Sequence, residues 1–86
     1  MFYTYILKCS DNTLYTGVAK DPIKRLVQHN IGKHGAKYTK ARLPVELIYT
    51  EPHENRSQAQ KREYQIKHLS KPEKLTLIDS NKSKDV

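Results

Sequence analysis

A short stretch near the N-terminus, residues 14–30 (LYTGVAKDPIKRLVQHN), holds a phenol and two basic side chains close together. Tyr15 and Gly17 point the same way if this stretch begins with a strand, because side chains alternate along a strand. Arg25 and His29 are four residues apart, so they are neighbours on a helix. Phenol and imidazole groups exchange protons, and a guanidinium group binds anions. We therefore expect the chemistry of the protein here.

The pattern around these residues predicts a strand, a tight turn and a helix. Asp21 is suited to cap the helix, with Pro22 at the first helical position, where a missing N–H costs nothing. An apolar stripe at helical spacing predicts the inward face of this helix, with Arg25 and His29 opposite it. The stripe consists of Ile23, Leu26, Val27 and Ile31.

Residues 2–9 (FYTYILKC) are rich in β-branched and aromatic types and predict a first strand, joined to the second through a turn at 10–13. A three-residue loop at 11–13 pairs Ser10 with Leu14 and places Tyr5, Tyr15 and Gly17 on one face. A two-residue loop would place the two tyrosines on opposite faces. We predict the first arrangement, or a bulge that restores the same parity.

A basic, glycine-containing segment at 32–42 separates the first helix from a third strand at 45–50. Long loops in small domains are usually functional or disordered. Its cations around one tyrosine suit phosphate contacts and base stacking, whereas a solvated mobile loop is the alternative. The candidate nucleic-acid-binding residues are Lys33, Lys37, Tyr38, Lys40 and Arg42.

A second helix is predicted from Ser57, with Gln60 completing a capping box. Glu63 falls within its inward stripe between Ala59 and Ile66, where a carboxylate is costly unless it meets a cation, a metal or several hydrogen bonds. A structural ion pair with a nearby Arg or Lys is the alternative. A second capping box at 70–73 predicts a third helix, which closes a domain over residues 1–79, with a polar tail at 80–86.

Composition narrows the class of protein. Eighty-six residues fit one domain, and the net charge of +7 favours a polyanionic partner, although simple solubility is the bland explanation. The single Cys9 cannot form an internal disulfide, which fits a reducing cytoplasm. We expect no membrane span and no signal peptide, since no apolar run of about 18 residues or cleavage pattern occurs. There is no P-loop, no GxGxxG and no zinc-ligand spacing.

In order, Tyr3-Thr4-Tyr5, Tyr15-Thr16-Gly17, Arg25, His29 and a helical Glu63 resemble the GIY-YIG nuclease superfamily. The chain is most similar to its small bacterial single-domain members, in which the patterns HNxGK…AKYTxxRxPV (here 29–45) and RExxIKxLSxxEK (here 62–74) recur. The first motif departs from the family, since Tyr3 and Thr4 stand where Gly and Ile are usual, and the second has Thr16 in its middle. We expect no separate DNA-binding domain, on which many nucleases of this superfamily depend for targeting.

The resemblance implies a role for each matching residue. Glu63 would be the single protein ligand of Mg²⁺ (or Mn²⁺), with waters and substrate phosphate completing the shell. Arg25 would hold the phosphate. Tyr5 and Tyr15 would flank the attacking water, one of them as general base; we favour Tyr5, with Tyr15 as the alternative. Cationic neighbours, His29 among them, would favour phenolate character, and His29 would position a tyrosine or shuttle a proton.

We therefore expect an α/β domain of the α+β type, in which helices flank a three-stranded antiparallel sheet. Its order is β-β-α-β-α-α, with the third strand beside the first. The implied activity is metal-dependent endonucleolytic hydrolysis of DNA in the cytoplasm, with damaged or branched DNA and repair as the candidate context. The alternatives are a non-catalytic nucleic-acid-binding module of the same fold, and a subunit active only with a protein partner in a repair complex. No oligomeric state is predicted.

Overall fold

A computed structural model describes residues 1–31 and 37–83 of the chain, with side chains described as far as residue 80. The strands form one antiparallel sheet in the order β2-β1-β3, so the third strand pairs with the first, as predicted. A short helix, α2, lies in the segment where the sequence predicted a loop. The elements are β1 (Phe2–Lys8), β2 (Leu14–Ala19), α1 (Pro22–Ile31), α2 (Lys37–Lys40), β3 (Glu46–His53), α3 (Arg56–Lys67) and α4 (Lys71–Ser83).

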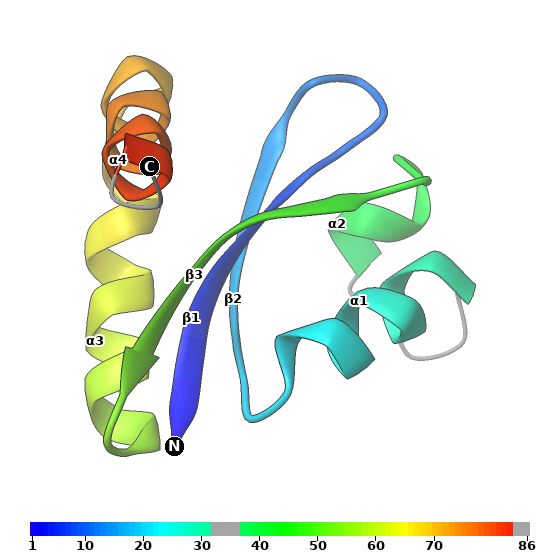
Figure 1. The fold of residues 1–86 in the computed structure, drawn as a ribbon. Coiled ribbons are helices and arrows are strands. Elements are labelled where there is room, and N and C mark those ends of the chain that lie inside the picture. Colours follow the sequence, from blue (N-terminus) through cyan, green and yellow to red (C-terminus); the bar gives the residue numbers. More distant parts are fainter. Residues whose placement is uncertain (32–36, 84–86) are drawn as a thin grey trace.

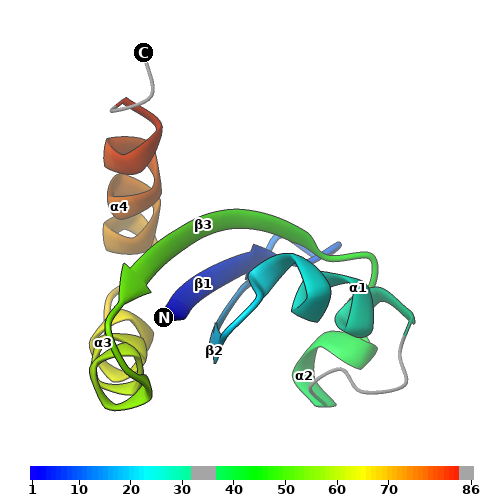
Figure 2. The ribbon, with the colours of Figure 1, turned by 60° about the horizontal axis from the view of Figure 1, so that its bottom comes forward.

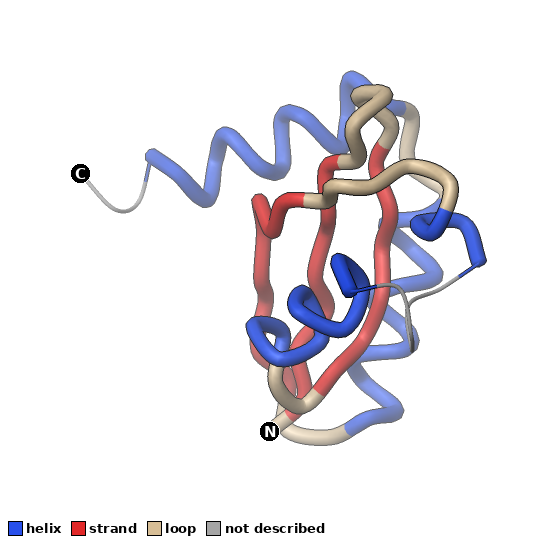
Figure 3. The backbone as a smooth tube through the Cα atoms, turned by 90° about the vertical axis from the view of Figure 1, so that its right-hand side faces the viewer, coloured by secondary structure: helices blue, strands red, loops and turns tan. Residues whose placement is uncertain are grey.

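Helices cover both faces of the sheet, α1 and α2 on one face and α3 and α4 on the other (Figures 1 and 2). Figure 3 shows α1 in front of the sheet and α3 behind it. Each face has its own apolar cluster, because strand side chains alternate. Tyr5, Leu7, Cys9 and Val45 are buried on the α1 side, and Ile6, Tyr49, Ile66 and Ile78 on the other. Cys9 is buried and packs in the α1-side cluster as a small hydrophobe.

The β1–β2 hairpin has the predicted parity but not the predicted pairing. Lys8 lies opposite Leu14 and Tyr5 opposite Gly17, so five residues, 9–13, connect the strands. The backbone N–H of Cys9 donates to the Thr13 carbonyl at 2.9 Å, and Asn12 adopts a left-handed conformation with φ of 66°. Asn tolerates that region better than most residues, which lets the longer turn close. A shift of two residues keeps the faces unchanged.

Helix α1 is capped as predicted but turned differently. The Asp21 carboxylate accepts a hydrogen bond from the Lys24 N–H at 3.1 Å. Of the predicted inward stripe only Leu26 packs against the core, whereas Ile23, Val27 and Ile31 are 63%, 54% and 60% exposed. That part of the prediction is wrong, because the inward face is formed by Pro22, Leu26 and His29, at i, i+4 and i+7.

Two side-chain hydrogen bonds fix this orientation of α1. The Asn30 amide donates to the Val45 carbonyl at 3.1 Å, and its oxygen accepts from the Val45 N–H at 2.8 Å. The C-terminal end of α1 is thereby joined to the residue before β3. Since side-chain amides satisfy both backbone groups, the helix is held by polar contacts that the apolar pattern does not report.

The caps of the last two helices contain one correction. Helix α3 begins at Arg56 with Asn55 as its N-cap, accepting from the Gln58 N–H at 2.9 Å, so the predicted box at Ser57 and Gln60 is wrong. The box at Ser70 and Glu73 is confirmed by reciprocal hydrogen bonds of 3.0 and 3.3 Å. Helix α4 then continues to Ser83, where a tail was predicted from residue 80; residues 84–86 lie outside the described part. No helix of the described ranges has the length and apolar content needed to cross a membrane.

Candidate active site at the β2 edge of the sheet

Three buried polar side chains form a continuous hydrogen-bonded row beneath α1. The Tyr5 hydroxyl lies 3.1 Å from His29 Nε2, and His29 Nδ1 lies 2.9 Å from the Thr39 hydroxyl. All three are almost completely buried, with exposed fractions of 2%, 0% and 0% for Tyr5, His29 and Thr39. Strand β1, helix α1 and helix α2 each contribute one member. Such a row can relay a proton, because each group can both donate and accept.

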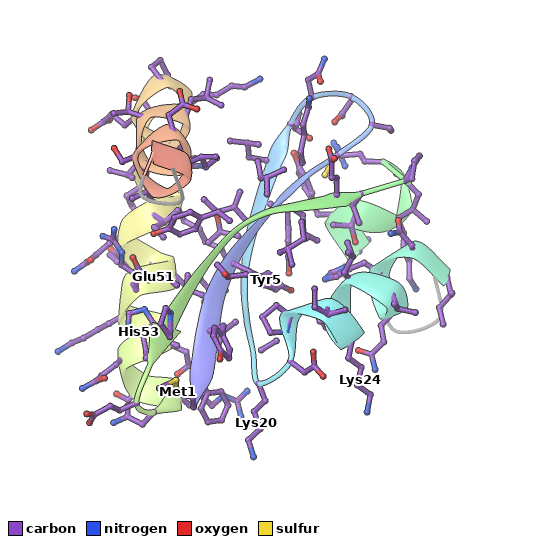
Figure 4. The ribbon with its side chains drawn as sticks, viewed as in Figure 1. Met1, Tyr5, Lys20, Lys24, Glu51 and His53 are labelled. Atoms are coloured by element: carbon purple, nitrogen blue, oxygen red, sulfur yellow. The ribbon has the colours of Figure 1, made fainter. Side chains whose placement is uncertain are left out.

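Gly17 makes the position of Tyr5 possible. It faces Tyr5 across the β1–β2 ladder, and a Cβ at Gly17 would lie 2.6 Å from both Cζ and Oη of Tyr5. A side chain there would collide with the phenol. The glycine therefore lets the Tyr5 ring extend across β2, which is the edge strand. Figure 4 shows Tyr5 on the α1 side of the sheet.

Tyr15 adjoins the same row, half-buried on the face that carries Tyr5 and Gly17. Its ring centroid lies 6.4 Å from that of Tyr5 and 5.4 Å from that of His29. These geometries are typical of favourable aromatic contacts. The prediction that Tyr5, Tyr15 and Gly17 share one face is confirmed. Helix α1 brings His29 to that face from its inward side, whereas the apolar stripe had placed His29 on the opposite side.

Burial dominates the electrostatics of this row. It raises the pKa of Tyr5 to about 12, with Tyr15 adding to the rise and the Arg25 guanidinium partly opposing it. Burial also lowers the pKa of His29, and the positive charge of Arg25 lowers it further. His29 is therefore neutral at neutral pH. The prediction that it contributes a positive charge to Tyr5 is wrong, because a buried imidazole disfavours its charged form.

The guanidinium group of Arg25 lies close enough to Tyr5 and His29 to shift the pKa of both. Its guanidinium lowers the pKa of Tyr5 and of His29, and its Nη1 donates to Gln28 Oε1 at 3.1 Å. The side chain is half-buried on α1. It places a permanent positive charge beside the phenol without being withdrawn from solvent, as anion binding requires.

Glu63 approaches from the other side of the sheet. It lies on α3, which covers the opposite face, and its charge raises the pKa of Tyr5, so the two groups are near each other around the β2 edge. Its side chain is 25% exposed and lies 3.5 Å from Lys67 Nζ. Glu63 is thus at the border of the inward stripe rather than inside it, and it does not approach from the face that carries Tyr5. The buried residues of α3 are Ala59 and Ile66.

The donor set suits a hard, largely hydrated cation. The described residues contain no group of three or more His, Cys, Asp or Glu side chains that could hold a metal ion. Glu63 offers a partly exposed carboxylate whose nearest cation is a flexible lysine. One carboxylate with waters and substrate oxygens is a normal Mg²⁺ environment. The residues present therefore fit Mg²⁺, and Mn²⁺ takes the same oxygen ligands.

The described part of the basic segment, residues 37–42, makes specific contacts around its tyrosine. Tyr38 stacks on Tyr15 with centroids 6.1 Å apart, and the Arg42 guanidinium lies 3.9 Å from the Tyr38 centroid. Arg42 also donates to Asp11 Oδ2 at 3.0 Å and to the Tyr38 carbonyl at 2.9 Å. Tyr38 and Arg42 are thus engaged with the protein itself. Lys37 and Lys40 are exposed on α2. Lys33 lies outside the described residues.

Thr39 is the member of the site that sequence reasoning missed. A threonine in a basic segment carries no signal of its own, since it neither titrates nor attracts anions. Its place in the recurring AKYT pattern was the available signal, read only for its lysine and tyrosine. The structure assigns it a buried contact with the imidazole.

A second polar cluster, on the α3 side, is satisfied internally. Both Glu51 oxygens accept from Arg62, and Tyr49 and His53 lie at hydrogen-bonding distance from the same carboxylate, at 2.8 and 2.9 Å. Burial alone would raise the pKa of Glu51, but these hydrogen bonds outweigh it and hold the pKa below its usual value. Figure 4 shows Glu51 and His53 near α3. The cluster fastens β3 to α3.

The sheet, its two helical layers and the tyrosine–histidine–carboxylate arrangement define a small catalytic-domain architecture. The family model described as "GIY-YIG catalytic domain" matches residues 1–76. The chain belongs to this family, which implies a nuclease-type activity and a DNA substrate. The resemblance seen in the sequence is thereby confirmed.

Close relatives share most of this domain. A UPF0213 protein of Staphylococcus saprophyticus is 57% identical over 76 residues, which cover 88% of this chain and 92% of the relative. A UPF0213 protein of Syntrophus aciditrophicus is 56% identical over 79 residues, 92% and 91% of the two chains. The solution structure of a UPF0213 protein from Bacillus halodurans is similar with a TM-score of 0.58 and 41% identity, over 92% of this chain and 84% of that one.

Proposed function

We propose that this protein is a metal-dependent endonuclease that hydrolyses phosphodiester bonds of DNA. The observation that carries the proposal is the Tyr5–His29 pair, beside the permanent cation Arg25 and within electrostatic reach of Glu63. A binding module needs no phenol buried against a neutral imidazole. Hydrolysis needs a path for the proton of water, a cation at the phosphate and a carboxylate for the metal.

The proton path follows the buried row. Water attacks phosphorus and the P–O3′ bond breaks, while the water proton passes to the Tyr5 oxygen and the phenolic proton passes to His29 Nε2. Tyr5 then stays neutral throughout, so its raised pKa is no obstacle. The net base is the neutral imidazole. The imidazolium later returns its proton to solvent, and the leaving O3′ oxygen takes one from solvent to become a hydroxyl group. Tyr15, half-buried beside this pair, flanks the water, and remains the alternative contact for its proton.

Thr39 fixes the direction of this transfer. A phenol is a better donor than an imidazole N–H, so the Tyr5 hydroxyl donates to Nε2 and the proton of the neutral ring resides on Nδ1. Nδ1–H then donates to the Thr39 oxygen at 2.9 Å. A second-sphere acceptor that fixes a tautomer is a recurring way of positioning a catalytic histidine.

Arg25 and Glu63 complete the assignment. Arg25 binds the scissile phosphate and the negative charge that develops on it. Glu63 would hold Mg²⁺ or Mn²⁺, which when bound supplies charge neutralisation at the phosphate and at the leaving oxygen. Lys37 and Lys40, exposed on α2, contact the DNA backbone, and Lys33 remains a proposed contact from the sequence. Damaged or branched DNA in a repair setting is the proposed context, with a protein partner as a means of targeting.

Substitution of Glu63 tests the proposal. Glu63→Gln should abolish Mg²⁺-dependent cleavage of duplex, flap, branched and single-stranded DNA, and leave DNA binding in metal-free buffer largely unchanged. The cost to the free energy of unfolding should be no more than about 0.5 kcal/mol, because only an exposed i, i+4 pair with Lys67 is lost. Thermal melts with and without Mg²⁺ report the fold and the metal binding separately.

Glu54→Gln is the matched control, because Glu54 is exposed just before α3 and its substitution removes the same negative charge. Cleavage that survives in Glu63→Gln would contradict the metal-site assignment. A wild-type protein that binds DNA but cleaves none of the four substrates with Mg²⁺ or Mn²⁺ would instead support the non-catalytic binding module.

A further inference from the structure

A small pocket lies along the first half of β2, next to the candidate site. Its volume is ≈ 270 Å³, and it is lined by Leu14, Tyr15, Thr16, Tyr38, Lys67 and Lys74. Tyr15 belongs to the face covered by α1, whereas Leu14 and Thr16 belong to the face covered by α3. The pocket therefore opens at the exposed edge of the sheet, where helices of both layers meet.

The two lysines give this pocket an unbalanced positive charge. Lys74 is half-buried, and its ammonium group forms no hydrogen bond or ion pair within the described residues. Lys67 has a half-exposed side chain whose ion pair with Glu63 is loose, at 3.5 Å. No carboxylate lines the pocket. A half-buried ammonium group without an anion is unfavourable, so the pocket favours an anionic occupant.

The floor of the pocket is aromatic and preorganised. Tyr38 stacks on Tyr15, and the Arg42 guanidinium lies 3.9 Å from the centroid of the Tyr38 ring. Arg42 is itself tied to Asp11 at 3.0 Å. The rings therefore offer a rigid surface next to the two ammonium groups. A sugar-phosphate unit has both the apolar surface and the charge that such a surface accepts.

A second group of cations lies at the other end of β2. The pocket there is lined by Ala19, Lys20, Asp21, Lys24, Arg25 and Gln28, and includes the guanidinium assigned to the scissile phosphate. Gly17, over which Tyr5 extends, lies between the two pockets along the strand. Two cationic positions on either side of the tyrosines define a path for one nucleic-acid strand along the β2 edge.

We propose that Lys67 and Lys74, with Tyr15 and Tyr38, bind the backbone phosphate of a nucleotide adjacent to the cleaved bond. This site rests on the proposed function for its place in the reaction, but phosphate binding is measurable without cleavage. It assigns a DNA contact to α3 and α4, the helices of the layer opposite α1 and α2. The DNA strand then runs along the β2 edge instead of over α2 alone.

A larger pocket between β1, β3 and α4 is a poorer candidate for a phosphate. It also contains two lysines, Lys8 and Lys71, but Glu46 and Asp79 line it as well. The Lys71 ammonium already donates to the Asn12 carbonyl at 2.8 Å. Its charges are balanced within the protein, unlike those at the β2 edge.

Binding of a fluorescent oligonucleotide across a salt series in metal-free buffer tests the site. Lys74→Gln should raise the Kd about tenfold and reduce the log–log salt slope by about 0.7 to 0.9, the loss of one phosphate contact. Lys61→Gln is the matched control, because Lys61 is exposed on α3 and lines none of these pockets. Lys74→Arg keeps the positive charge and should bind the oligonucleotide as the wild type does. This variant tests the site even if Lys74→Gln folds poorly.

Titration with inorganic phosphate, followed by NMR shifts of Tyr15 and Tyr38, separates a general phosphate site from one that needs the nucleic-acid strand. Shifts with phosphate alone that vanish in Lys74→Gln indicate a general phosphate site, and shifts with oligonucleotide only indicate recognition of the strand; both support the pocket. Equal Kd values and slopes for Lys74→Gln and Lys61→Gln would overturn the proposal. DNA binding that needs Lys74 in a protein without cleavage would keep this site and reject the nuclease assignment. Full cleavage by a Lys74→Gln protein with unchanged binding would reject this site and keep the nuclease assignment.

Discussion

One buried hydroxyl group, that of Thr39, sets the direction in which the Tyr5 proton can move in the proposed mechanism. Thr39→Val keeps the shape of the side chain but removes the acceptor of His29 Nδ1–H. Cleavage should fall about 10- to 100-fold, the usual effect of removing the hydrogen-bond partner that orients a functional histidine. The free energy of unfolding should fall by about 1–3 kcal/mol, since a buried donor loses its partner. Single-turnover cleavage and chemical denaturation measure the two effects.

Thr39→Ser restores the hydroxyl group and should recover most of the cleavage rate. The ¹⁵N chemical shifts of His29 give the readout that a purely structural role would not change. We expect Nδ1 to be protonated in the wild type and in Thr39→Ser, and the preference to weaken in Thr39→Val. A protonated Nε2 in the wild type would contradict the relay, whatever the activity of the variants.

Which residues approach the site was predictable from sequence, but how they are held there was not. Parity of the hairpin placed Tyr5, Tyr15 and Gly17 on one face, because an error of two residues in register leaves faces unchanged. The neutrality of His29 could not be predicted, since it depends on complete burial by α1 and α2. Apart from its place in the AKYT pattern, Thr39 gave no chemical signal, because its role exists only through the imidazole that it contacts.

At the scale of elements, the predictions failed where polar contacts override the apolar pattern. Four apolar residues of α1 suggested one inward face, but Asn30 joins the helix to Val45 and His29 is turned inward, leaving three of the four exposed. Asn55 starts α3 two residues earlier than the box at Ser57 suggested. By contrast, strand order and the Ser70 cap follow from local chemistry, and both were predicted correctly.

The basic residues in and just after α2, which the sequence grouped together, are of two kinds in the structure. Lys37 and Lys40 are exposed, so Lys37→Gln/Lys40→Gln should flatten the log–log salt slope of DNA binding by about 1.8 if both contact duplex phosphates. Arg42→Gln should act mainly on stability, because it removes contacts with Asp11 and Tyr38. Denaturation and salt-dependent binding of all three proteins compare these effects. An unchanged slope for the lysine double variant would make α2 a solvated surface.

At the scale of the whole molecule, the proposed site lies at one edge of the three-stranded sheet and takes residues from both helical layers. Tyr5, Arg25 and His29 belong to the α1 side, whereas Glu63, Lys67 and Lys74 come from helices on the other side. The glycine in β2 allows the Tyr5 ring to extend across that strand, towards the edge of the sheet that α3 also borders. A domain of 86 residues thus forms its site from nearly every element.

The stability of the whole domain should therefore depend on the protonation of its most buried titratable ring. Burial, reinforced by Arg25, lowers the pKa of His29, so the unfolded chain binds a proton more readily than the folded protein does. The pKa of histidine in the unfolded chain is about 6.5. Above that pH, protonation of His29 does not reduce the free energy of unfolding. Below it, the free energy of unfolding falls, by up to about 1.4 kcal/mol at pH 5.5. Chemical denaturation between pH 7.5 and 5.5 should show this loss, and His29→Gln should lack it. The carboxylates with lowered pKa values, Asp11, Glu51 and Glu73, titrate at more acidic pH and do not contribute in this window.

Cleavage should decline over the pH range in which the folded ring protonates, because an imidazolium Nε2 cannot accept the Tyr5 proton. An NMR titration midpoint for His29 at or above 6.5 would contradict both expectations.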